Sequence, residues 1–177
     1  MTRKRNLFGK DWSDLRAEIN KVLEHKKFSA EEFRALSMRD NWKEIENNIY
    51  NSFYNPTYLN QKPNFLWNDF KHDTFSVSDL KYRPEYYLDK LIFEHEKVWY
   101  LVNETINETT KYWIYEGKIK KIQIIIDETG FDELCIVSKK YDWLICINHH
   151  DILIATGSKM IEKLKNLKYK ELQERNN

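Results

Sequence analysis

Residues 132–147 read DELCIVSKKYDWLICI, two short apolar runs separated by a polar turn. In the first run both Leu134 and its neighbour Cys135 are apolar, although neighbouring side chains of a strand point to opposite faces of the sheet. Strands that are apolar on both faces lie in the interior of a sheet that is covered on both sides. We therefore predict two central antiparallel strands, 132–138 and 142–147, joined by a hairpin turn.

The chain on either side of this stretch extends the predicted sheet. Residues 98–102 and 112–115 are rich in β-branched and aromatic side chains and predict a hairpin with a long polar loop. A helical stripe of isoleucines follows over 119–126, where the β-branched run leaves a strand as the alternative. A strand over 151–156 and a helix beginning at Ser158 complete the order β-β-α-β-β-β-α. This order predicts an α+β fold with a mainly antiparallel sheet.

The N-terminal part of the chain has a helical pattern instead. Apolar residues at three- and four-residue steps predict a helix over 12–26, and a similar stripe predicts another after Asp40. The capping box formed by Ser29 and Glu32 predicts the start of a further helix. Pro84 suits the first turn of a short helix.

We expect a single α+β domain over residues 1–177, mostly helical and irregular over 1–95, with the sheet over 96–170. Residues 55–83 contain two prolines and many large rings. We therefore expect an ordered segment that lies against the core, and such a segment can carry a binding surface.

Composition limits the class of protein. The 177 residues are 41% hydrophobic and 15% aromatic, enough for a sizeable core. The 29 basic and 28 acidic side chains give a net charge of +1, which argues against a nucleic-acid partner. No apolar run is long enough for a membrane span or follows the basic N-terminus as in a signal peptide. We expect a cytoplasmic protein with no membrane partner, whose Cys135 and Cys146 are buried, reduced thiols.

Asn148-His149-His150-Asp151 is a polar cluster between two predicted strands. Imidazole and carboxylate groups bind zinc and transfer protons, so a metal site, a catalytic histidine and a binding epitope are all open for this turn. Neighbouring side chains on extended backbone point to opposite faces, however, and the chain has no HxH or HExxH spacing. We expect a hairpin turn in which Asn148 and Asp151 bond local backbone, and we assign no metal ligand, cofactor or catalytic residue.

Acidic side chains gather at the predicted loops and at the ends of the predicted elements. Paired carboxylates can carry out acid–base or metal-dependent hydrolysis, but turns commonly hold such residues, so we expect them on the surface. They are Glu104, Glu108, Asp127, Glu128, Asp132, Glu133 and Asp142.

A resemblance rests on three segments, 98–102, 112–117 and 141–151. Residues 96–160 resemble a family of small cytosolic bacterial proteins of unknown function, and the stretch from Trp143 to Asp151 is the most specific part of the likeness. Members of that family are similar in type to immunity proteins that neutralise toxins. The resemblance implies a protein partner and supplies no catalytic residues.

We therefore predict a non-enzymatic protein-binding domain that acts as an immunity protein by binding a bacterial toxin directly. Its predicted surface combines aromatic anchors from 55–83 with polar loop ends. The loop residues are Glu104, Glu108, Asp142, Asn148, His149, His150 and Asp151. The less favoured alternative is an enzyme, a small hydrolase or nuclease that uses the His149-His150-Asp151 cluster.

Overall fold

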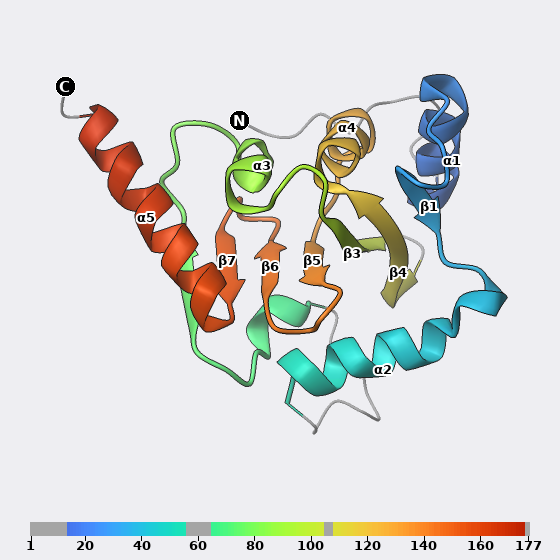
Figure 1. Ribbon diagram of the computed structural model, residues 1–177, viewed down its shortest axis with the longest axis horizontal. Helices are drawn as coiled ribbons and strands as arrows, with labels where there is room; N and C mark the ends of the chain where they lie inside the picture. The colour runs from blue at the N-terminus through green and yellow to red at the C-terminus, as the bar shows by residue number, and fades with distance from the viewer. Residues whose placement is uncertain (1–13, 56–64, 105–107, 176–177) are drawn as a thin grey trace.

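The computed structural model describes residues 14–55, 65–104 and 108–175, and its centre is a seven-stranded sheet (Figure 1). All neighbouring strands are antiparallel, in the order β1-β4-β3-β5-β6-β7-β2. The strands are β1 (Phe33–Ala35), β2 (Thr74–Val77), β3 (Lys97–Glu104), β4 (Glu108–Lys118), β5 (Leu134–Ser138), β6 (Leu144–Ile147) and β7 (Leu153–Thr156).

Helices cover both faces of this sheet. The α-helices are α1 (Leu15–Lys26), α2 (Trp42–Phe53), α3 (Leu88–Leu91), α4 (Ile119–Thr129) and α5 (Ser158–Arg175), and short 3-10 helices are η1 (Met38–Asp40), η3 (Leu66–Asn68) and η4 (Pro84–Tyr87). In Figure 1, α2 lies across the sheet from α1, α3 and α4. Within the described ranges, no helix combines the length and the apolar character needed to cross a membrane.

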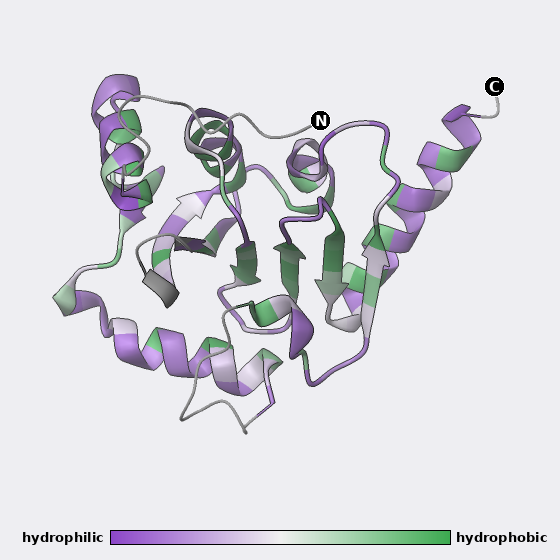
Figure 2. Cartoon of the chain, turned by 180° about the vertical axis from the view of Figure 1, so that it is seen from behind, coloured by the Kyte–Doolittle hydropathy of each residue, from purple (hydrophilic) through white to green (hydrophobic). Residues whose placement is uncertain are grey.

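Alternation along the strands divides the interior into two cores. Leu134 and Ile136 of β5 face the core covered by α1, α3, α4 and α5. Cys135 and Val137 face the second core, which α2 and η3 cover. The central strands are accordingly hydrophobic along their length, while the helices carry hydrophilic residues on their outer sides (Figure 2). Every residue of β5, β6 and β7 is buried.

The predicted order β-β-α-β-β-β-α is confirmed by β3-β4-α4-β5-β6-β7-α5. Residues 119–129 form a helix and not the alternative strand, because Ile119, Ile122 and Ile126 make one buried stripe. Gly130 follows this helix at the C-cap position with φ of 74°.

One prediction for the first 95 residues was wrong, the helix that would begin at Ser29. The Ser29 amide donates to Glu32 Oε2 at 3.0 Å, which is one half of the predicted capping box, but this contact closes only a turn that leads into β1. Phe33 of β1 stacks on Tyr115 of β4, so tertiary packing outweighs the local helix signal. Besides the helices, the N-terminal part supplies both edge strands of the sheet, β1 and β2.

The hairpin of β3 and β4 is longer than predicted. Strand pairing continues to Glu104 and resumes at Glu108, inside the stretch expected to be loop. A register irregularity between Asn103 and Glu104 lets the pairing continue there.

Gly157 is the position where the backbone most clearly requires glycine. Its φ is +91°, and a Cβ there would meet the Asp142 carbonyl oxygen and lie 2.9 Å from Trp143 Cα. Both neighbours are backbone atoms of the turn that enters β6, and backbone cannot easily move aside.

We expect Gly157→Ala to lower the free energy of unfolding by at least about 2 kcal/mol, combining strain and overpacking. The matched control is Gly117→Ala, where a Cβ would meet a ring atom of Phe33 at 2.6 Å, because a side chain can yield where backbone cannot. Urea denaturation of both variants measures the difference. Equal losses in the two variants would contradict the argument.

Candidate functional site

The predicted double-histidine turn lies at one end of the sheet, after β6. Asn148 Oδ1 accepts hydrogen bonds from the amides of His150 at 3.0 Å and Ile152 at 3.1 Å. The Asp151 amide donates to the Asn148 carbonyl oxygen, and Asp151 adopts a φ of 60°. The expectation that Asn148 bonds local backbone is therefore confirmed.

Aromatic rings pack directly against this turn. The Phe65 ring lies 4.8 Å from the His149 ring, and the Trp67 ring meets His150 edge-on at 6.1 Å, measured between centroids. The two imidazoles are 3.9 Å apart, so the turn brings together side chains that an extended backbone would separate. We call these four residues the aromatic–histidine patch. Both histidines are exposed and both rings are half-buried.

The charge around the patch affects His149. Partial burial and the neighbouring His150 lower the pKa of the His149 imidazole, and the charge of Asp132 opposes that shift. Both neutral and charged histidine can contact a partner, but the lowered pKa favours the neutral ring.

The structure places the predicted acidic residues at different ends of the sheet. Because Val102 pairs with Leu134, the ends of β3 and β4 that carry Glu104 and Glu108 lie toward the end of the sheet that holds the patch. The side chains of Glu104 and Glu108 lie outside the described residues. Asp142 lies in the β5–β6 turn at the opposite end, where its amide donates to the Ser138 hydroxyl. The prediction that Asp142 shares a surface with the histidines was wrong.

Glu133 lies in a different place from the one that the sequence predicts. It was expected on the surface, but its side chain is fully buried at the start of β5. Its Oε1 accepts hydrogen bonds from the Leu66 amide at 3.0 Å and the Trp67 amide at 3.2 Å. Tyr112 and Cys146 also contact this carboxyl group. Thus η3, which carries the rings of the patch, is held by a buried carboxyl group beneath it.

Burial dominates the ionisation of this group. It raises the pKa of the Glu133 carboxyl to about 7, although the hydrogen bonds from Tyr112 and from the Trp67 and Leu66 amides act in the other direction. Burial likewise raises the pKa of the Cys146 thiol. Cys135 and Cys146 are both free and buried, as predicted, and with Glu133 they are a set of side chains that could hold a metal ion.

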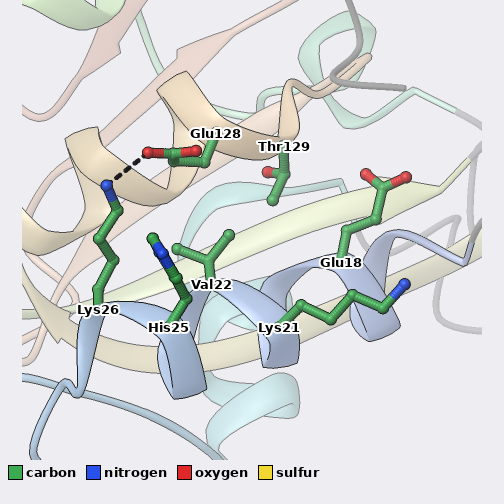
Figure 3. Close-up of a pocket in the computed structure, with 7 residues that line it drawn as sticks. All are labelled: Glu18, Lys21, Val22, His25, Lys26, Glu128 and Thr129. Carbon is green, nitrogen blue, oxygen red and sulfur yellow. Dashed lines mark ion pairs between the residues drawn. The ribbon is translucent and has the colours of Figure 1, made fainter. Parts of the chain in front are cut away.

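A separate cavity of about 270 Å³ lies between α1 and α4 (Figure 3). Val22 and Thr129 line it, and Lys26 of α1 pairs with Glu128 of α4 at 2.7 Å across the gap between the helices. These helices pack on the first core, whereas η3 packs on the second. The cavity is therefore not part of the aromatic–histidine patch.

We expect the Glu133 carboxyl group to make stability depend on pH. Its folded-state pKa of about 7 exceeds the ordinary value of 4.5, so the folded protein retains a proton that the unfolded chain releases. The free energy of unfolding should fall as pH rises from 4.5 to 7, by at most about 3 kcal/mol relative to Glu133→Gln. Urea denaturation across this range, in buffer with a chelator, measures it. Parallel pH profiles for wild type and variant would contradict the assignment.

Comparison with known proteins gives one match. A model of a family of unknown function, DUF6756, matches residues 11–168, which include all seven strands and the double-histidine turn. Neither the curated proteins nor the solved structures yield a match. Because the family model spans most of the sequence, the chain belongs to DUF6756, a family of unknown function.

Proposed function

We propose that this chain is a non-enzymatic protein-binding domain that acts as an immunity protein, covering the active site of a bacterial toxin. The observation that carries the proposal is the aromatic–histidine patch, in which Phe65 and Trp67 pack against His149 and His150 at one end of the sheet. Exposed or half-buried rings beside polar groups are the usual composition of a binding hot spot.

The patch is held in place before any partner binds. Backbone amides of Leu66 and Trp67 donate to the buried Glu133, and Asn148 fixes the backbone of the histidine turn. A surface that is ordered in advance loses less conformational entropy when it binds. This favours recognition of a folded protein with a complementary shape.

The charge near the patch favours a basic partner. Asp132 acts electrostatically on His149, and Asp151 lies in the same turn. Residues 96–157 carry ten acidic and seven basic side chains, so this region is acidic overall. A toxin that acts on nucleic acid needs a basic active site, and the stacking rings of the patch with carboxylates nearby would complement it.

We expect Trp67→Ala and His149→Ala each to weaken toxin binding by about tenfold or more, as truncation of a hot-spot residue does. The partner is the protein that co-purifies with the chain from its own cells and is lethal when expressed alone. Calorimetry gives the affinities, and survival on co-expression gives the function.

The matched control is Tyr169→Ala, which removes a ring that is 62% exposed on α5, over the other face of the sheet. This variant should bind and protect like the wild type. If the Trp67 and His149 variants also bind and protect like the wild type, the patch is not the binding surface. A co-purifying protein that is harmless when expressed alone would contradict the immunity function.

The hydrolase or nuclease alternative has one observation in its favour. Perturbed ionisable groups gather at functional sites, and Glu133, with a pKa of about 7, lies next to Asp132, whose charge acts on His149. Glu133 is fully buried, however, and its Oε1 is engaged by backbone amides, which suits a structural role better than contact with substrate. Hydrolysis of RNA, DNA or an ester by the wild type that is lost in His149→Ala would overturn the binding proposal.

A further inference from the structure

Strand geometry brings three potential ligands to one place in the second core. Cys135 of β5 and Cys146 of β6 are register partners on adjacent antiparallel strands. Glu133 precedes Cys135 by two residues, so both side chains project from the same face of the sheet. All three residues are fully buried.

The ligand atoms of this cluster are close together. One carboxylate oxygen of Glu133 and the two Sγ atoms lie within 4.8 Å of one another. Cys146 Sγ is 3.8 Å from Glu133 Oε1, and the Tyr54 hydroxyl is 3.6 Å from Cys135 Sγ. Ligand atoms around a tetrahedral zinc ion stand about 3.5 to 3.8 Å apart, given its bond lengths. Small side-chain rotations would therefore bring these atoms to coordinating positions.

The two oxygens of Glu133 differ in a way that points to a ligand. Oε1 accepts hydrogen bonds from the amides of Leu66 and Trp67. Oε2 is equally buried and has no hydrogen-bond partner among the described residues. A buried acceptor without a partner is costly, and a cation is one group that would satisfy it.

We propose that Glu133, Cys135 and Cys146 bind a thiophilic divalent cation, with zinc as the ion that best fits this donor set. Two thiolates and one carboxylate are common zinc ligands, and thiolates select against magnesium and calcium. The Tyr54 hydroxyl, 3.6 Å from Cys135 Sγ, is a further polar group beside the cluster. The amides of Leu66 and Trp67 hold the carboxylate from outside, as partners of metal ligands commonly do.

The charge balance supports a divalent ion. Three deprotonated ligands would place a charge of about −3 in a dry core, which an ion of +2 largely neutralises. Thiolate and carboxylate are the forms that coordinate a metal, so binding would release protons from any ligand that is protonated. The ion would join β5 and β6 and, through Glu133, hold η3 in place. This inference does not depend on the proposed binding function.

The first experiment measures metal content. The full chain is purified from cells grown with added zinc, without a chelator, and its metals are measured by mass spectrometry. We expect about one zinc per chain in the wild type and a loss of most of it in Glu133→Gln and in Cys146→Ala. Glu85→Gln is the matched control, since Glu85 is also fully buried but pairs with Arg83 in the other core, and it should retain zinc.

The second experiment does not depend on the variants folding. The wild type is unfolded, freed of metal and refolded with cobalt, which gives charge-transfer absorption when thiolates coordinate it. We expect one equivalent of cobalt to produce these bands and excess zinc to abolish them. Metal-free protein from cells together with no bands after refolding would overturn the proposal. Undiminished zinc in the Cys146 variant, or a Cys135–Cys146 disulfide in the purified protein, would overturn it as well.

Discussion

The two central strands, β5 and β6, are covered by protein on both faces, and most of the structure follows from this burial. A polar side chain on these strands cannot reach water, so its partners must come from the fold itself. Glu133 is the clearest case, because a buried carboxyl group without hydrogen bonds would destabilise the protein strongly. Amides from η3 and the Tyr112 hydroxyl supply the bonds. The position of η3 is thus tied to one carboxyl group.

The same contacts connect the interior to the surface. The backbone of η3 bonds Glu133, while the rings of Phe65 and Trp67 pack against the histidine turn. Strand β6 carries Cys146 inside and leads through Asn148 to the exposed histidines. The aromatic–histidine patch therefore rests on two elements that meet at Glu133. Movement of either element would change the spacing of the rings.

The sequence was sufficient for the features that local pattern controls. The two apolar alternations around Cys135 predicted central strands, and the stripe of isoleucines predicted α4. The short edge strand β1 exists only because residues far apart in sequence pair, as Phe33 does with Gly117. The capping pattern at Ser29 therefore predicted a helix at a place where a strand forms. Nothing local indicates such pairing, and a three-residue strand carries little pattern of its own.

The candidate site was half predictable for a similar reason. The turn residues were identified from composition, and so was the ring-rich segment, but only the fold reveals that they meet. The sequence does contain a signal for the burial of Glu133: it lies two residues before Cys135, so both side chains project from the same face, toward a core. A carboxyl group and two thiols at such a place depart from the apolar pattern of their strands. Departures of that kind are expected where function rather than stability selects the residue. The proposed metal site consists of these three residues, whereas the proposed binding surface is the aromatic–histidine patch, which η3 links to Glu133.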